Sequence, residues 1–373
     1  MSAQSLRLIA LVLSDLALGA TAADLEPPPL PSRIVFLGDS ITDGFSYPSL
    51  VRQALREAGK PVPVCVNAGI GGDTAKGMRA RLDRDVLVHR PDLVTLSAGI
   101  NDVLHKVALE GYEADVRAIL ERMKQEKVPV LILTTSVLGG KTEEADRRLA
   151  GHNAILRKLA EEYGRRVADV YQVMDAERKK GTKVLEEDDV HPNYAGHRCM
   201  AQAVLDALGC ADVPVPEKMK VEPYPGLLTP WRLKAVADPK AAVLDENSVA
   251  ALKPDASWTT LNLPESEPQA HWWSEQTRQE GFAVSLEKAA GKAPRYLACA
   301  ALTAEQARKA YVNTGGGLQT VWLNGKRIYK AGDWTGYHPG RERIPVELQA
   351  GENSVVIETG PQFFLSVTDD NRW

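Results

Sequence analysis

The stretch Phe36-Leu37-Gly38-Asp39-Ser40-Ile41-Thr42-Asp43-Gly44 determines the fold prediction for the first half of the chain, because it joins a strand pattern to a helix pattern. The apolar run 33–37 is short and β-branched, which is typical of a buried strand. Residues 47–59 follow with helical spacing, so Ser40 lies on a strand-to-helix turn. In an open α/β sheet, ligands bind above such turns, where backbone N–H groups are free to bind an anion. Ser40 is therefore a candidate catalytic serine, although Gly-Asp-Ser is also ordinary turn and helix-capping chemistry.

Strand and helix patterns alternate from residue 32 to residue 210. This alternation predicts a parallel sheet with helices on both faces. Because crossovers between parallel strands are right-handed, we expect an α/β fold with a flavodoxin-like order of five strands in three layers. The further strand runs are 62–66, 93–97, 128–134 and 166–171, and the helical patterns are 47–58, 74–89, 111–127, 143–163 and 194–208.

The second half of the chain has a different texture. A Pro-rich linker occupies 211–226, and all seven Trp residues follow residue 230. Asn324-Gly325 between two β-rich runs is the strongest short hairpin signal, and it joins runs 320–323 and 326–329. Further strands are expected at 353–359 and 363–368, with a short helix or loop at 303–310. We predict a smaller all-β sandwich over 227–373.

The N-terminus resembles an export signal. Arg7 precedes the apolar run 8–20, and Ala20-Thr21-Ala22 fits a small-residue cleavage site. We expect residues 1–22 to be a signal peptide and 23–31 a Pro-rich spacer, which predicts a secreted or periplasmic protein. The alternative is an N-terminal helix that is not cleaved. No other stretch is long and apolar enough to predict a membrane span.

The composition excludes some classes of binding partner. With a net charge of −4 the chain lacks the excess of basic residues typical of nucleic-acid-binding proteins, so nucleic acid is not an expected partner. The seven His residues are scattered without ligand spacing, and we expect neither a metal nor another cofactor. The four Cys residues are interpreted as free thiols. The oligomeric state cannot be predicted.

Three further segments follow strands and fall at the edge of the sheet where Ser40 lies. The glycine-rich block 67–74 permits close backbone approach and offers the N–H of Gly72, or it is a turn with a helix cap. Asn101 can donate a side-chain N–H, or it caps a helix. An Asp three residues before a His can orient that imidazole through one ring nitrogen, which makes Asp188 and His191 a candidate pair. The four consecutive acids 186–189 are equally compatible with a solvated loop.

Together these blocks resemble the SGNH (GDSL-type) hydrolase family over residues 32–210. The matches are Gly-Asp-Ser at 38–40, the glycine block ending at Gly72, Gly-x-Asn-Asp at 99–102 and Asp-x-x-His at 188–191. The resemblance implies that Ser40 is the nucleophile, His191 the general base and Asp188 the residue that orients His191. It also implies an oxyanion hole formed by the N–H groups of Ser40 and Gly72 and the amide of Asn101.

Asp189 is the alternative to Asp188 for orienting His191 only because it is adjacent in the sequence. The neighbouring acids Asp39, Asp43 and Asp102 are interpreted as structural.

The second half is similar, over about forty residues, to jelly-roll sugar-binding domains attached to glycoside hydrolases. Its matching segments are 321–326, 336–340 and 348–355. We therefore expect a secreted serine esterase that acts on a small-molecule or polysaccharide ester, with deacetylation of a carbohydrate as the leading hypothesis. Carbohydrate contact by this half is weighed against a structural role. The alternatives are a lysophospholipase, lipase or thioesterase of the same family, and a non-enzymatic carbohydrate-binding or scaffold protein with an inactive hydrolase domain.

Overall fold

A computed structural model describes most of the chain beyond the N-terminal segment. The predicted signal peptide, the Trp272-Trp273 pair and the segment 336–340 lie outside the described residues. The described ranges are 29–44, 46–140, 143–220, 225–238, 244–263, 284–332 and 342–369.

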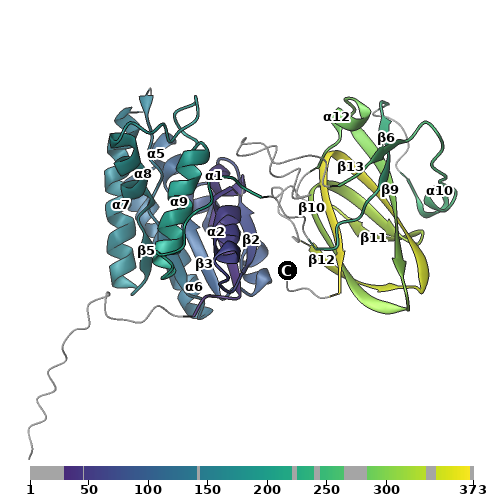
Figure 1. Ribbon diagram of the computed structural model, residues 1–373, viewed down its shortest axis with the longest axis horizontal. Coiled ribbons are helices and arrows are strands. Elements are labelled where there is room, and N and C mark those ends of the chain that lie inside the picture. The colour runs from purple at the N-terminus through teal and green to yellow at the C-terminus, as the bar shows by residue number, and fades with distance from the viewer. Residues whose placement is uncertain are drawn as a thin grey trace, which may run out of the picture.

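The first half is built on a five-stranded parallel sheet (Figure 1). Its strand order, β2-β1-β3-β4-β5, is the flavodoxin-like order and confirms the predicted α/β fold. Neighbouring strands pair in parallel throughout, so their carboxyl ends lie along one edge of the sheet. The strands are β1 (Arg33–Gly38), β2 (Val64–Gly69), β3 (Leu93–Ser97), β4 (Val130–Leu133) and β5 (Arg166–Ala168).

Helices cover both faces of this sheet, because successive side chains of a strand point to opposite faces. In β1, Ile34 and Phe36 pack in the core under α2 (Ser46–Glu57), α8 (Val170–Lys179) and α9 (Tyr194–Ala207). The alternate side chains Val35 and Leu37 pack in the opposite core. That core is covered by α3 (Ala75–Ala80), α4 (Leu82–Asp85), α6 (Leu109–Gln125) and much of α7 (Glu143–Glu162).

Several predicted boundaries differ from the structure. The run 62–66 belongs to β2, which begins at Val64 and continues to Gly69. The run 166–171 ends as a strand at Ala168, because Asp169 caps α8 by accepting from Gln172 N at 3.2 Å. The pattern 74–89 is not one helix but α3, α4 and a 3-10 helix, η1 (Leu87–His89). It breaks at Arg81, whose backbone leaves helical values (φ −116°, ψ 12°).

The second half is an antiparallel sheet of eight described strands. The predicted hairpin is present, with Asn324 and Gly325 both at positive φ between two of the strands. The strands are β6 (Trp231–Val236), β7 (Thr259–Leu261), β8 (Val284–Ser285), β9 (Arg295–Ala304), β10 (Arg308–Leu323), β11 (Lys326–Lys330), β12 (Glu342–Leu348) and β13 (Gly351–Thr368).

The long strands β10 and β13 each take part in two sets of pairings. The first half of β10 pairs with β12, and its second half pairs with β11. The pairing of β10 with β13 shifts register between Gly316 and Thr320, where the strands change partners. The runs 353–359 and 363–368, predicted as separate strands, are therefore parts of β13. The segment 303–310 is not a helix; it is the end of β9, a short turn and the start of β10.

The tryptophans that the structure describes in this half belong to its interior. Trp231, Trp258 and Trp322 are buried. Trp231 packs edge-on against Phe363, with ring centroids 5.2 Å apart. Trp231 belongs to the main core of the antiparallel unit, and Trp322 packs in a smaller cluster with Val249 and Val356.

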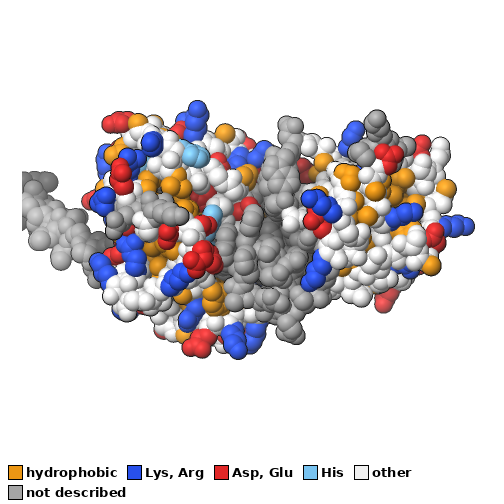
Figure 2. Space-filling model, turned by 90° about the horizontal axis from the view of Figure 1, so that it is seen from above, with side chains coloured by type: hydrophobic (Ala, Val, Ile, Leu, Met, Phe, Trp, Pro, Cys, Tyr) orange, Lys and Arg blue, Asp and Glu red, His pale blue; other side chains and the backbone are white. Residues whose placement is uncertain are grey.

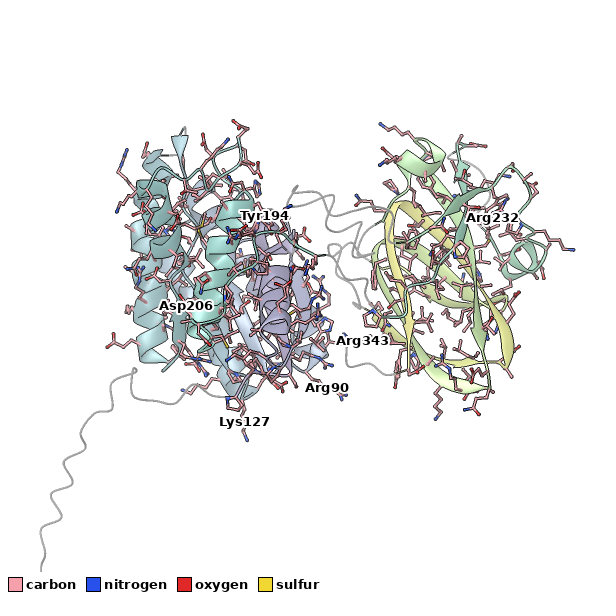
Figure 3. All side chains as sticks on the ribbon, in the orientation of Figure 1. Arg90, Lys127, Tyr194, Asp206, Arg232 and Arg343 are labelled. Carbon is pink, nitrogen blue, oxygen red and sulfur yellow. The ribbon has the colours of Figure 1, made fainter. Side chains whose placement is uncertain are left out.

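The antiparallel unit contacts the parallel unit at its α2–α9 face and at η1. Phe364 of β13 is fully buried in the same core as the residues of α2 and α9. Arg343 of β12 donates from Nη1 to Nδ1 of His89 at 3.0 Å. Figure 3 shows Arg343 on the side of the antiparallel unit that faces the parallel unit, and Arg232 near its far side.

The described surface is of mixed charge. Figure 2 shows acidic and basic side chains interspersed over the face that it draws. The four cysteines are free thiols. Among the helices that the structure describes, none is long and apolar enough to cross a membrane.

Candidate active site

Ser40 is the first residue of a short helix, α1 (Ser40–Asp43), directly beyond the carboxyl end of β1. Asp39 caps this helix, and its carboxylate accepts from Ile41 N at 3.0 Å. Burial raises the pKa of Asp39 to about 7, against its helix-cap hydrogen bond and the nearby His191, which both lower it. The backbone N–H of Ser40 lies in the first turn, where helix N–H groups have no intrahelical acceptor. The cap therefore fixes Ser40 at the mouth of the sheet.

Two glycines allow α1 to lie directly on the strand ends. A Cβ at Gly38 would lie 2.1 Å from Thr42 Oγ1, and a Cβ at Gly69 would lie 2.2 Å from Asp43 N. Only glycine permits this approach without displacing the turn. The glycine of Gly-Asp-Ser is therefore required by packing.

His191 and Asp188 come from the loop between α8 and α9. Ser40 Oγ lies 2.8 Å from Nε2 of His191, and Nδ1 of the same ring lies 2.6 Å from Asp188 Oδ2. Pro192 pairs with Leu185 across the base of this loop. The side chain of His191 is 25% exposed, so the hydroxyl–imidazole contact is accessible to a ligand.

The carboxylate of Asp188 is held by the loop itself. Its Oδ1 accepts from the N–H groups of Val190 and His191, both at 2.9 Å. Burial acts to raise the pKa of Asp188, but hydrogen bonds from the His191 ring and from these two N–H groups outweigh it and hold the pKa below its ordinary value. Asp188 is thus an ionised acceptor that orients the imidazole.

Asp189 faces away from the imidazole. Its backbone has φ +61°, and its carbonyl accepts from Gly139 N at 3.1 Å. Its carboxylate lies against Gly140, where an added Cβ would be 2.0 Å from Asp189 Oδ2. Of the two neighbouring acids, Asp188 alone is bonded to the His191 ring among the described contacts.

The glycine block passes beside Ser40. Ile70 N donates to Gly38 O at 3.1 Å, and a Cβ at Gly71 would lie 3.9 Å from Ser40 Cβ. Gly72 follows at φ +78°. Asn101, on α5 (Ile100–Leu104), donates from Nδ2 to the carbonyl of Asp73 at 3.0 Å. An amide has two N–H bonds, so the second is left for a ligand.

The other acidic residues near the site are buried and contact neighbouring backbone groups. Asp102 is buried and accepts from Ala75 N at 3.2 Å and 3.3 Å, and burial raises its pKa to about 6. Burial also raises the pKa of Asp43 to about 7. Asn67, on β2, donates to the carbonyl of Asp43 at 2.8 Å and accepts from Gly69 N. Asn67 therefore connects α1 to the end of β2, and Asp102 connects α5 to the start of α3.

Sequence reasoning missed one buried cation next to these residues. Arg81, at the break between α3 and α4, is 5% exposed and bonds to Gly38, Ala68, Asp73 and Asp85. The sequence carried no signal that Arg81 is buried, because an arginine near the end of a helix is ordinarily exposed to solvent.

The arrangement places the Ser40 hydroxyl within hydrogen-bond distance of an imidazole that a carboxylate orients. A serine hydroxyl is a weak nucleophile until a base removes its proton, and a neutral imidazole oriented by a carboxylate is such a base. The five residues predicted for the site, Ser40, Gly72, Asn101, Asp188 and His191, all lie at the carboxyl edge of the parallel sheet. Within the described ranges, no group of three or more His, Cys, Asp or Glu could hold a metal ion.

Comparison with known proteins finds sequence similarity to ester hydrolases. Residues 36–199 match the GDSL-like Lipase/Acylhydrolase family model. The chain is similar to an acetylxylan esterase of Geobacillus stearothermophilus, 28% identical over 205 residues that cover 48% of this chain and 94% of the relative. It is also similar to an arylesterase of Vibrio mimicus, 30% identical over 138 residues that cover 35% of this chain and 65% of the relative.

Two solved structures are similar over the same share of the chain. One is an alpha/beta hydrolase enzyme from the metagenome of Lake Arreo, with 29% identity, a TM-score of 0.44, and coverage of 48% of this chain and 96% of that one. The other is an acetylxylan esterase from Geobacillus stearothermophilus, with 27% identity, a TM-score of 0.45, and coverage of 49% and 97%.

Proposed function

Because the chain contains a GDSL-like Lipase/Acylhydrolase domain and is a carboxylic ester hydrolase, we propose that it cleaves its ester through an acyl-enzyme on Ser40. The match to this family model and the similarity to two esterases support the prediction of a carboxylic ester hydrolase. The observation that carries the proposal is the hydrogen-bonded series Ser40 Oγ, His191 and Asp188, with distances of 2.8 Å and 2.6 Å.

In the first half of the reaction, Ser40 Oγ attacks the ester carbonyl while Nε2 of His191 takes the hydroxyl proton. Asp188 holds Nδ1–H and stabilises the imidazolium that forms. The carbonyl oxygen becomes an oxyanion, which accepts hydrogen bonds from the N–H groups of Ser40 and Gly72 and from the free N–H of Asn101. The imidazolium then gives its proton to the departing alcohol oxygen, and the acyl group stays on Ser40.

In the second half, water takes the place of the alcohol. His191 removes a proton from water, which attacks the acyl carbonyl of the Ser40 ester. Collapse of the second oxyanion breaks the bond to Ser40 Oγ, and His191 returns the proton to that oxygen. The products are the free acid and the restored enzyme.

Hydrolysis of p-nitrophenyl acetate, butyrate and octanoate tests the nucleophile and the acyl length together. We expect the wild type to cleave acetate fastest and Ser40→Ala to lose about 10⁴-fold or more in kcat. A fluorophosphonate probe should label the peptide that contains Ser40. If Ser40→Ala keeps its activity, or if the probe labels another serine, the assignment of the nucleophile is wrong.

We further propose that the substrate is an acetylated carbohydrate. A relative that aligns over almost its whole length is an acetylxylan esterase, and this supports the substrate class. Release of acetate from acetylated xylooligosaccharides is the test. A preference for octanoate, with no acetate released from these sugars, would instead support the lysophospholipase, lipase or thioesterase alternative.

Carbohydrate contact by the antiparallel unit stays a prediction. The three described tryptophans are buried in its core, so they offer no ring for a sugar to stack on. Retention of the inactive Ser40→Ala chain on acetylated xylan, and its loss when the chain is cut after the parallel-sheet unit, would support such a contact.

Export is part of the same proposal. The apolar run 8–20 and the small residues at 20–22 support cleavage after Ala22. Expression of the whole chain in a bacterium should give a periplasmic or secreted product whose intact mass corresponds to a start at Ala23. A cytosolic product that retains residues 1–22 would contradict it.

A further inference from the structure

Arg81 bonds to three separate segments around Ser40. Its Nε donates to Asp73 Oδ2 at 2.7 Å, and its Nη2 donates to the carbonyl of Gly38 at 2.9 Å. Its Nη1 donates to the carbonyl of Ala68 at 2.8 Å and to Asp85 Oδ2 at 3.3 Å. The guanidinium is almost fully buried, so water cannot replace these contacts freely.

Each acceptor belongs to a part of the site. Gly38 ends β1 two residues before Ser40, and Ala68 lies on β2 in register with Leu37. Asp73 lies near the end of the glycine-rich block 67–74, and its backbone carbonyl accepts a hydrogen bond from the side-chain amide of Asn101 at 3.0 Å. One planar cation therefore fixes the strand end that carries Ser40 and the loop that carries Gly72.

We propose that Arg81 is a positioning residue for the ester hydrolysis described above, an inference that rests on the proposed function. By holding Gly38, Ala68 and Asp73 together, it sets the spacing between the nucleophile and the donors for the oxyanion. It touches no reacting atom. A misplacement of about 1 Å in such a site costs about 100-fold in rate, so the loss of this spacing would appear in kcat.

The geometry requires an arginine. Two carbonyls and a carboxylate lie around a single side chain in different directions, and the forked guanidinium reaches all of them. A lysine keeps the charge beside Asp73 and Asp85 but has one nitrogen, so it cannot reach both carbonyls. Arg81→Lys should therefore retain part of the kcat of the wild type, and a neutral substitution should retain less.

The helix offers a matched control. Arg84 also bonds to Asp85, at 2.7 Å, but it is 46% exposed, and none of its described hydrogen bonds reaches a strand end. Arg81→Lys and Arg81→Gln are compared with Arg84→Lys and Arg84→Gln in the full chain, with p-nitrophenyl acetate as substrate. We expect kcat to fall about 10- to 100-fold in Arg81→Lys and further in Arg81→Gln, with KM within about twofold of the wild type. Both Arg84 variants should stay within about twofold of the wild type.

Circular dichroism and thermal unfolding separate positioning from simple loss of the fold. A kcat loss in Arg81→Lys that only tracks the unfolded fraction, or wild-type kcat in a folded Arg81→Lys, overturns the inference. If neither Arg81 variant folds, Asp73→Asn serves in their place, because it removes the charged partner and keeps the backbone of the loop. We expect Asp73→Asn to lose about 10-fold in kcat, and an unchanged kcat would overturn the inference.

A double-mutant cycle tests the route through the oxyanion donors. If Arg81 acts through them, Arg81→Lys should cost several-fold less in an Asn101→Ala background than in the wild type. The same fold-loss in both backgrounds overturns the inference. Ser40→Ala distinguishes the two levels: activity that survives Ser40→Ala refutes the proposed function itself, whereas an inactive Ser40→Ala beside unaffected Arg81 variants refutes only the role of Arg81.

Discussion

Asp188 accepts a hydrogen bond from Nδ1 of His191 at 2.6 Å, and the loop that joins them holds both groups in place. The other carboxylate oxygen of Asp188 accepts two backbone N–H groups of the same loop. The imidazole is therefore fixed with Nε2 toward Ser40. A three-residue separation is enough for this geometry because the chain between them forms a tight turn with Asp189 at positive φ.

Replacing Asp188 tests this relationship. Asp188→Asn keeps the size of the side chain but removes the charge that selects the Nδ1–H form of the ring. We expect kcat for p-nitrophenyl acetate to fall on the order of 10⁴-fold. Asp189→Asn is the matched control, since its side chain lies against Gly140 and not against the imidazole, and it should lose less than about tenfold. Equal losses in the two variants would reject the assignment of Asp188.

Asn101 should affect the rate more than the affinity. The Asp73 carbonyl orients its amide, and in the proposed mechanism the second N–H meets charge that develops only in the transition state. We expect Asn101→Ala to lower kcat about 100-fold with KM nearly unchanged. A rise in KM at constant kcat would show instead that Asn101 binds the substrate in its ground state.

The order of the parallel sheet could be predicted from the sequence because each element carries its own local signal. Apolar runs predicted the strands, and alternation with helices together with right-handed crossovers left few topologies. The sequence prediction failed at two places where apolar runs did not match the element boundaries. Val170 and Tyr171 extend an apolar run but belong to α8, and the runs 353–359 and 363–368 were predicted as separate strands although both belong to β13.

Ser40, Gly72 and Asn101 could be predicted because each lies a few residues after a strand, whereas Asp188 and His191 follow α8 and were predicted from their three-residue spacing. Parallel strands bring the first three of these points to one edge whatever lies between them, and Ser40 and His191 meet there although 151 residues separate them. Arg81 could not be predicted in this way. Its role depends on a break in the α3–α4 helix and on the direction of a long side chain that reaches Gly38, 43 residues away.

The glycine of Gly-Asp-Ser should be needed for packing. Because a Cβ at Gly38 would lie 2.1 Å from Thr42 Oγ1, Gly38→Ala must displace α1 or the strand end. We expect a loss of about 1–3 kcal/mol in the free energy of unfolding, measured with denaturant. Esterase activity should fall at least about tenfold as Ser40 moves. Gly71→Ala is the control for stability, since its Cβ would make an ordinary contact, 3.9 Å from Ser40 Cβ. Equal stability of the two variants would contradict this account.

The buried helix cap Asp39 should give the fold a measurable pH dependence. Burial raises the pKa of its carboxyl from 3.8 to about 7, so between these values the folded chain keeps a proton that the unfolded chain has released. The contribution of Asp39 to the free energy of unfolding therefore decreases as pH rises from about 4 to about 7. Asp39→Asn keeps an oxygen to cap Ile41 but does not titrate, so this decline should be shallower in the variant. Burial also raises the pKa of Asp43 to about 7, so Asp43 should keep part of the pH dependence of stability in the Asp39→Asn variant.

Asp245, the exposed N-cap of α10 (Glu246–Ala250), should change the stability with pH in the direction opposite to Asp39. Hydrogen bonds from the hydroxyl and N–H of Ser248 hold the pKa of Asp245 below its ordinary value, so its contribution is present above that value and is lost as pH falls. Denaturant unfolding of both Asn variants at several pH values between about 2.5 and 8 covers both titrations, that of Asp245 below about pH 4 and that of Asp39 between about 4 and 7. Relative to the wild type, Asp39→Asn should become more stable toward neutral pH, and Asp245→Asn less stable. If both variants shift in the same direction, the carboxyl of Asp39 is ionised in the folded protein, and its burial does not control its protonation.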